Sequence, residues 1–126
     1  MTIYLETMRQ VSEYLRNLED CIKGAAASIA SYLDLVSFKM VVNTLKSEDP
    51  HAVKNAIDQL VKEKRPVAIP PLYLVSTSHP TGWVRAQAKK GLAELIEEPE
   101  LTRLTEGKDV KAALGALIEK FGNYRG

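Results

Sequence analysis

Side chains that could bind a metal ion or act as nucleophiles are few in this sequence, and they lie far apart along the chain. His51 and His79 are the two histidines of the 126 residues, and neither has a second His or a Cys at a spacing typical of a metal site. Because a zinc site needs three or four converging ligands, no metal site is predicted. Cys21, the single cysteine, has no histidine near it and cannot form an internal disulfide. We interpret it as a small buried or half-buried residue.

A hydroxyl cluster formed by Ser76, Thr77 and Ser78 is the other place where catalysis could be sought. It follows an apolar segment, and we interpret it as the end of a helix. The sequence contains no Gly-x-Ser-x-Gly elbow and no glycine-rich loop that could hold a phosphate. We therefore predict no catalytic residues and no cofactor, and we do not expect an enzyme.

The charge balance argues against partners that require a strong electrostatic field. Seventeen Lys and Arg residues stand against sixteen Asp and Glu, which gives a formal net charge of +1. No general attraction to nucleic acid or to an anionic membrane follows from that value. Charges interrupt every apolar stretch before about 18 residues, and no secretory signal pattern is present. With the single cysteine, these features predict one cytoplasmic domain over residues 1–126.

Apolar residues in the first third of the chain recur every three or four positions, as on one stripe of a helix. Gly24 is the weak point of this segment, so we predict helices over residues 2–23 and 25–33, with one kinked helix as the alternative. Residues 1–36 then form an N-terminal helical pair. The residues of the stripe are Met8, Val11, Leu15, Leu18, Ile22, Ala26, Ile29 and Leu33.

From residue 37 onward the chain repeats the order apolar helix, turn, amphipathic helix. The first copy, residues 37–66, contains SFKMVVNTL, the turn SEDPH and AVKNAIDQLVKEK. The second copy, residues 67–98, contains AIPPLYLVS, the turn SHPTG and WVRAQAKKGLAELIEE. Since proline is tolerated in the first turn of a helix, Pro70 and Pro71 predict a helix start near Ile69.

Three valines mark equivalent positions in these copies. Val53 and Val84 are each followed by a basic residue and, four, seven and eight positions further on, by apolar or small residues, and Val110 opens an abbreviated third copy within residues 99–126. Such units cannot bury their apolar faces alone, so they stack on one another, with modified units at the ends. We expect the three helices that begin near these valines to lie side by side in register.

The string IPPLYLVSTSHPTGWVRAQAKKGLAEL resembles HEAT repeats, in which an apolar helix and a short Asp/Pro turn lead into a helix that opens with Val-Arg. DPHAVKNAIDQL and KDVKAALGALIEKF are similar to weaker copies. The repeat is shorter than the usual HEAT range of about 40 to 47 residues and is similar to the short HEAT-like repeats of phycobilisome lyases. This resemblance covers residues 37–121. It implies an all-α fold, a short right-handed α-solenoid of stacked helical hairpins with about five to seven helices. In this setting Ala86, Ala88 and Gly91 let adjacent helices approach closely.

Four residues are the candidate binding residues: Tyr73, Trp83, Arg85 and Lys89. The last three follow one turn and helix face of the best formed repeat, and Tyr73 follows the double proline. Tyrosine and tryptophan often anchor interfaces because they bury much area and order few torsion angles. For Trp83 an equal alternative is that it staples the turn onto the neighbouring helix.

Arg85, with Lys54 and Lys111 at matching positions, has two interpretations. The three side chains could present a basic ladder to a partner. The resemblance to HEAT repeats favours the other interpretation, in which this position forms a salt bridge or caps the neighbouring turn.

The leading functional hypothesis is a non-catalytic protein-binding or adaptor module with a protein partner. The resemblance implies an alternative, a phycobilisome-related chromophore lyase-like or accessory role, which requires a pocket for a bilin and cationic groups for its propionates. Nucleic-acid binding along a basic concave face is disfavoured by the neutral overall charge. Tyr4, Tyr14 and Tyr32 either cover the open end of the stack or meet a second copy of the chain, which leaves a homodimer as an option.

Overall fold

A computed structural model of the chain describes residues 39–121. All regular elements of this part are helical, in agreement with the predicted all-α class. A helical segment over residues 39–44 is followed by α3 (Pro50–Glu63), the short 3-10 helix η1 (Pro66–Ala68), α4 (Ile69–Ser78), α5 (Gly82–Leu95), α6 (Glu98–Thr105) and α7 (Val110–Phe121). The predicted N-terminal helical pair, residues 1–36, lies outside the described residues together with Cys21 and the three tyrosines of that segment.

Local sequence signals explain where these helices begin. The side chain of Asp49 caps α3 by accepting a hydrogen bond from the His51 backbone N–H at 3.0 Å, and Pro50 occupies the first turn. The start of α4 at Ile69, with Pro70 and Pro71 in its first turn, confirms the position predicted from the double proline. Proline causes no loss there, because the N–H groups of a first turn have no partner within the helix.

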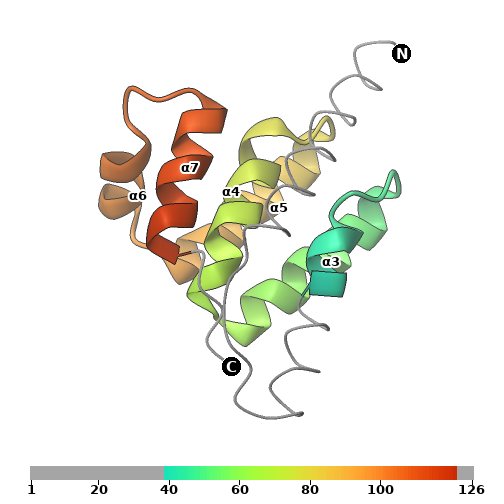
Figure 1. The fold of residues 1–126 in the computed structure, drawn as a ribbon. Coiled ribbons are helices and arrows are strands. Elements are labelled where there is room, and N and C mark those ends of the chain that lie inside the picture. Colours follow the sequence, from blue (N-terminus) through green and yellow to red (C-terminus); the bar gives the residue numbers. More distant parts are fainter. Residues whose placement is uncertain (1–38, 122–126) are drawn as a thin grey trace.

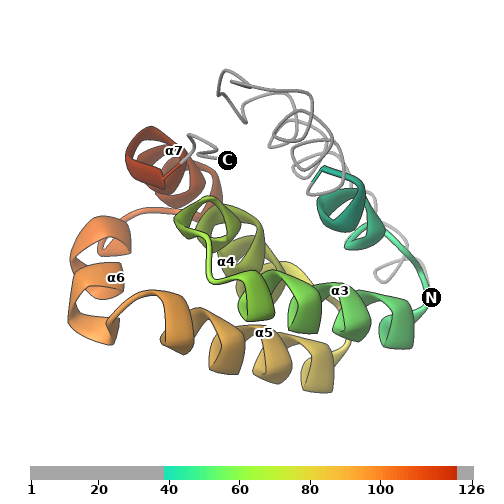
Figure 2. The same ribbon diagram turned by 90° about the horizontal axis from the view of Figure 1, so that it is seen from below.

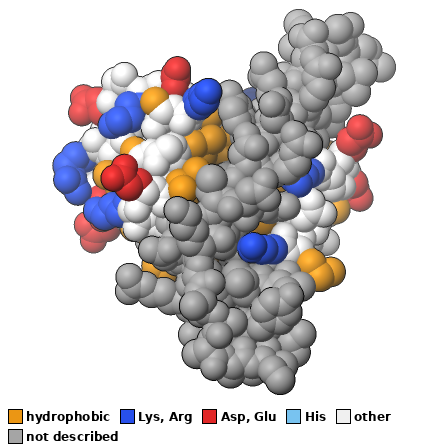
Figure 3. All heavy atoms as spheres, in the orientation of Figure 1, with side chains coloured by type: hydrophobic (Ala, Val, Ile, Leu, Met, Phe, Trp, Pro, Cys, Tyr) orange, Lys and Arg blue, Asp and Glu red, His pale blue; other side chains and the backbone are white. Residues whose placement is uncertain are grey.

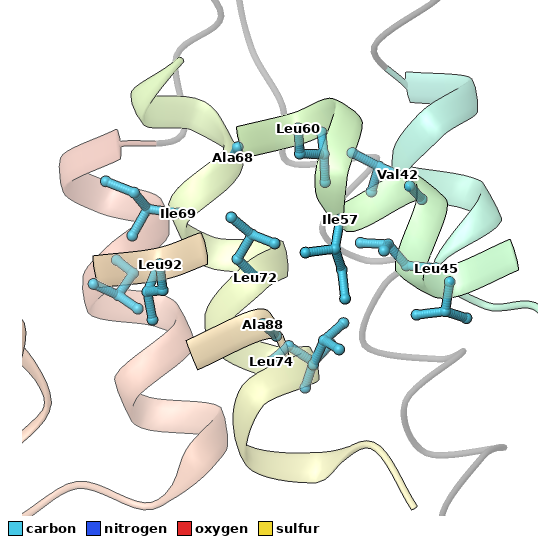
Figure 4. Close-up of a cluster of buried hydrophobic side chains, with 14 of the residues drawn as sticks. Val42, Leu45, Ile57, Leu60, Ala68, Ile69, Leu72, Leu74, Ala88 and Leu92 are labelled. Carbon is cyan, nitrogen blue, oxygen red and sulfur yellow. The ribbon is translucent and has the colours of Figure 1, made fainter. Parts of the chain in front are cut away.

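One buried cluster joins the helical segment 39–44 to α3, α4 and α5 (Figure 4). Leu72 and Leu74 on α4 are fully buried, as are Ile57 on α3 and Ala88 on α5. Each large apolar side chain that is fully removed from water contributes about 1.5–3 kcal/mol to the stability of the fold. This shared core fixes the relative positions of the helices that carry the candidate binding residues.

The second helices of the first two copies pack against each other as expected. Figure 2 shows α3 and α5 lying side by side, and the two helices are in direct contact. Val53 and Val84, which open these helices in the repeat pattern, are both completely buried. Between the two helices lies Gly91, where an added Cβ atom would come within 2.5 Å of Val61 Cγ2. The prediction that a small residue here allows close approach is therefore confirmed for Gly91.

The third copy does not continue this row. Within the described residues α7 packs against α4 and α6 and has no comparable contact with α5, and Figure 1 shows α7 beside α4. Val110 is only half-buried, unlike Val53 and Val84. The expectation that all three helices stack side by side is therefore wrong for α7. The physical reason lies in α6, which has eight residues and buries none of them, so that Leu114 and Leu117 of α7 cover α4 in its place.

Candidate binding site

The long helix α5 presents two different sides to its surroundings. On one side Gln87 Nε2 donates a hydrogen bond to Asp58 Oδ1 of α3 at 3.1 Å, and Gly91 packs against Val61. On the other side Lys89 and Leu92 line a cavity that α5 shares with α4 and α6. The four candidate binding residues are consequently divided between separate places.

A cavity of about 370 Å³ lies between α4, α5 and α6. Its apolar part is formed by Leu92, Ile96 and Leu101, of which the first two are only 3% and 6% exposed. The charged side chains at its edge are Lys89 and Glu98, and both are exposed. We call this cavity the α4–α5–α6 pocket, and its lining consists of Tyr73, Ser76, Thr77, Lys89, Leu92, Ala93, Ile96, Glu98, Leu101, Thr102 and Thr105.

Two of the four candidate binding residues, Tyr73 and Lys89, meet in this pocket. They come from different helices, and Tyr73 is half-buried whereas Lys89 is exposed. An aromatic ring and a flexible cation at the edge of an apolar hollow are suited to contact a side chain with an apolar body.

Three of the hydroxyl groups in the pocket are engaged by the helices that carry them. Ser76 Oγ donates to the Tyr73 carbonyl oxygen at 2.7 Å, and Thr105 Oγ1 donates to the Leu101 carbonyl oxygen at 2.8 Å. Thr77 Oγ1 lies 3.1 Å from the Tyr73 carbonyl oxygen. Because the hydroxyl protons are used in this way, these three groups face the pocket as weak acceptors, and its surface is less polar than the residue types alone imply.

The hollow exists because α6 stands apart from α4 and α5. All of its residues retain solvent exposure, and within the described residues its extensive contacts are with α7. An ion pair between Lys120 Nζ and Glu100 Oε1 at 2.6 Å joins α7 to α6. That pair, led by the hydrogen bond from Lys120, also lowers the pKa of the Glu100 carboxyl group. Because α6 is short and is held by α7 on one side, there is room for another molecule on its opposite side.

Arg85 turns back to the loop that precedes its helix. Its Nη1 donates a hydrogen bond to the His79 carbonyl oxygen at 2.6 Å. This contact closes the turn between α4 and α5 with a charged donor, which makes a stronger hydrogen bond than a neutral one. The interpretation of Arg85 as a cap of the neighbouring turn therefore has direct support in the structure.

Trp83 lies at the start of α5 against the start of α3. Its ring centroid is 5.4 Å from that of His51, and the two planes are tilted by 43°. Trp83 nevertheless remains 45% exposed. Both interpretations made from the sequence are thus compatible with its position, since the ring touches the neighbouring helix and also offers free surface.

His79 is a polar residue whose burial was not predicted from the sequence. It is 1% exposed, and its Nδ1 accepts a hydrogen bond from the Thr81 backbone N–H at 3.0 Å. Its Nε2 is buried and has no hydrogen-bond partner among residues 39–121. Burial lowers the pKa of the imidazole, and the positive charge of Arg85 acts in the same direction. At neutral pH His79 is therefore uncharged and serves as an acceptor within the turn.

No cluster of three or more His, Cys, Asp or Glu side chains able to hold a metal ion occurs within residues 39–121. Over the same part of the chain, no helix combines the length and the apolar composition needed to cross a bilayer. Comparison of the chain with protein-family models, with curated proteins and with solved structures found no match.

Several residues of the α4–α5–α6 pocket were not predicted from the sequence as binding residues. Ile96 and Leu101 were not singled out because they flank the break between α5 and the stunted helix, where the repeat pattern is weakest. Thr102 and Thr105 appear in the sequence as polar residues of an exposed helix. Pro99 favours a helix start and therefore indicates a separate helix α6. No local feature of the sequence indicates how far α6 lies from α4.

Proposed function

We propose that the protein is a non-catalytic protein-binding module in which the α4–α5–α6 pocket receives an apolar side chain of a protein partner. The observation that carries this proposal is the meeting of Tyr73 and Lys89 at an apolar hollow of about 370 Å³. Binding energy in protein interfaces is concentrated in a few anchors that fill such hollows, surrounded by polar residues. The polar edge formed by Lys89, Glu98 and the three threonines fits this description.

The proposed architecture is a HEAT-like stack of two helical hairpins closed by α6 and α7. Support comes from the contact of α3 with α5, the second helices of the first two repeats. The third unit departs from the row, as a modified end unit of a repeat stack does. On this proposal the pocket lies at the junction between the regular stack and its end unit.

A chromophore-related role is less well supported by the same pocket. Its lining contains one cationic side chain, Lys89, together with the anionic Glu98. The two propionates of a bilin would require at least two cations nearby. The volume also lies near the lower end of the range of about 300–1,000 Å³ typical of small-molecule sites.

The test is affinity purification with a variant that fills the pocket. Ala93 is exposed and lines it, so Ala93→Phe should occupy the hollow without disturbing the core. Ala112→Phe, an exposed alanine on α7, is the matched control. We expect partners captured by the wild type and by Ala112→Phe to be lost with Ala93→Phe, in a protein with unchanged thermal unfolding. Equal capture by all three proteins would refute the role of the pocket.

A further inference from the structure

A second hollow, separate from the α4–α5–α6 pocket, runs between α3 and α5. It is a groove of about 300 Å³. Ile57 and Val61 of α3 and Gly91 of α5 contribute its apolar part, and the two helices approach closely there because Gly91 has no side chain. We call it the α3–α5 groove. It lies on the side of α5 that faces α3, opposite to Lys89.

Three lysines line this groove. Lys62 and Lys64 come from the end of α3 and Lys90 from the middle of α5. Lys62 and Lys64, like Lys90, are exposed. None of the ion pairs within residues 39–121 involves any of the three.

One of the two acidic residues in the lining is already engaged. Asp58 Oδ2 lies 2.6 Å from Lys54 Nζ, and Asp58 Oδ1 accepts the hydrogen bond from Gln87. The hydrogen bond from Lys54 lowers the pKa of Asp58 most, and the charge of Lys90 contributes to the same effect. Glu94 is then the one remaining carboxylate of the lining, against three lysines that form no ion pair within residues 39–121. With Lys54, which lies outside the lining and pairs with Asp58, four lysines stand against two carboxylates at and beside the groove.

Lys64 occupies a backbone position that glycine would fill at lower cost. It caps the end of α3 in the left-handed conformation, with φ 52° and ψ 39°. Helices commonly end in this conformation with glycine, because an L side chain is crowded there. A lysine at this position therefore keeps a cation at the groove at some expense of stability.

We propose that the α3–α5 groove binds an acidic segment of a protein partner, with an apolar side chain over Val61 and Gly91 and carboxylates at Lys62, Lys64 and Lys90. Charge complementarity selects this partner, since the groove is lined by three lysines that form no ion pair in the described part of the chain, whereas the carboxylate of Asp58 is already paired with Lys54. The apolar floor favours a peptide over a nucleic acid, whose affinity depends on many phosphate contacts.

The test uses the full chain and a fluorescein-labelled peptide of sequence Glu-Glu-Leu-Glu-Glu, with Gln-Gln-Leu-Gln-Gln as the neutral probe. Fluorescence polarisation at low salt should detect the acidic peptide and not the neutral one, and the affinity should fall as salt is added. Lys62→Glu/Lys90→Glu should weaken binding about tenfold or more, because two attractions become repulsions. Amide resonances of Gly91 and methyl resonances of Val61 should shift on titration.

The matched control is Arg103→Glu/Lys111→Glu, which makes the same change of charge on α6 and α7. Both residues are exposed, and Figure 3 shows cationic and anionic side chains mixed on the side of the molecule that carries these helices. This control should stay within about twofold of the wild type. Lys64→Gly should raise the urea midpoint and yet weaken peptide binding, which an unfolded variant cannot do.

Absence of acidic-peptide binding by the wild type would overturn the proposal, and so would equal weakening by the control pair. Tighter binding of a single-stranded DNA oligonucleotide than of the acidic peptide would overturn it in favour of a phosphate ligand. The Ala93→Phe variant should bind the acidic peptide normally, so that failure of the α4–α5–α6 pocket and failure of this groove are distinguishable.

Discussion

Gly91 of α5 lies so close to α3 that a Cβ atom at this position would come within 2.5 Å of Val61 Cγ2. Gly115 of α7 provides a contrast, since an added Cβ there meets nothing within 4 Å. Both glycines are inside helices, where alanine is intrinsically favoured over glycine by about 1 kcal/mol. The two positions therefore separate helix propensity from helix packing.

We expect Gly91→Ala to lower the free energy of unfolding by about 1 kcal/mol, because the overlap with Val61 costs about 1–3 kcal/mol and outweighs the gain in propensity. Gly115→Ala should raise it by about 0.5–1 kcal/mol. Urea unfolding measures both. The double variant Gly91→Ala/Val61→Ala should recover stability relative to Gly91→Ala alone. A stabilising Gly91→Ala would show that α3 and α5 are not in close contact at this point.

Removal of the Arg85 side chain should open the turn between α4 and α5. Arg85→Ala loses the charged hydrogen bond to the His79 carbonyl oxygen, which lies at 2.6 Å, and should lower the free energy of unfolding by about 1–2 kcal/mol. Lys111, which follows Val110 as Arg85 follows Val84, is exposed and supplies the control. Lys111→Ala should change stability by less than about 0.5 kcal/mol. Equal effects of the two changes would contradict a special role for Arg85 in the turn.

Stability should fall in mild acid because of His79. Its pKa in the folded chain lies below the ordinary value of 6.5, so the unfolded chain binds more protons as the pH drops below that value. The free energy of unfolding therefore decreases from about pH 6.5 downward, whereas above pH 6.5 the contribution of His79 is fully present.

Urea unfolding at pH 7.5 and at pH 5 tests this prediction with His79→Asn as the comparison. The amide oxygen of asparagine can accept the hydrogen bond from the Thr81 N–H in place of Nδ1, which lies at 3.0 Å, and it does not titrate. The variant should lose less stability between the two pH values than the wild type. Because His51 is present in both proteins, the difference reports on His79. Parallel losses would exclude His79 as the source.

The contact between His51 and Trp83 can be followed directly, since Trp83 is the single tryptophan of the chain. His51→Ala removes the ring that lies 5.4 Å from the indole. We expect the emission of Trp83 to shift to longer wavelength and its quenching by acrylamide to increase. The stability should fall by about 0.5–1.5 kcal/mol, as for other aromatic pairs.

Asn55→Ala changes an exposed residue one turn further along α3 and should leave the emission unchanged. An unaltered spectrum in His51→Ala would indicate that the two rings do not meet in solution.

Local signals in the sequence were sufficient to locate the starts of α4 and α7. The double proline at Pro70 and Pro71 predicted the start of α4, and the repeat pattern predicted that a helix opens at Val110. The pairing of α3 with α5 was also accessible, because Val53 and Val84 recur at the same offset from a turn. Proline geometry and apolar period act over a few residues, so they can be interpreted without knowledge of the rest of the chain.

The repeat pattern did not predict which helix α7 packs against. The apolar stripe of α7 could pack against α5 as well as against α4. It packs against α4 because α6 is too short to bury any of its residues there. The direction of the Arg85 side chain and the burial of His79 likewise depend on how the turn between α4 and α5 folds onto the core.

The sequence by itself determined the helical class and the starts of α4 and α7, because each of these follows from residue type and short-range spacing. Only the tertiary structure decided that Tyr73 and Lys89 share one pocket, and that Lys62, Lys64 and Lys90 surround one groove. A hollow forms where helices distant in sequence fail to fill the space between them, and that depends on how whole helices pack rather than on any single segment.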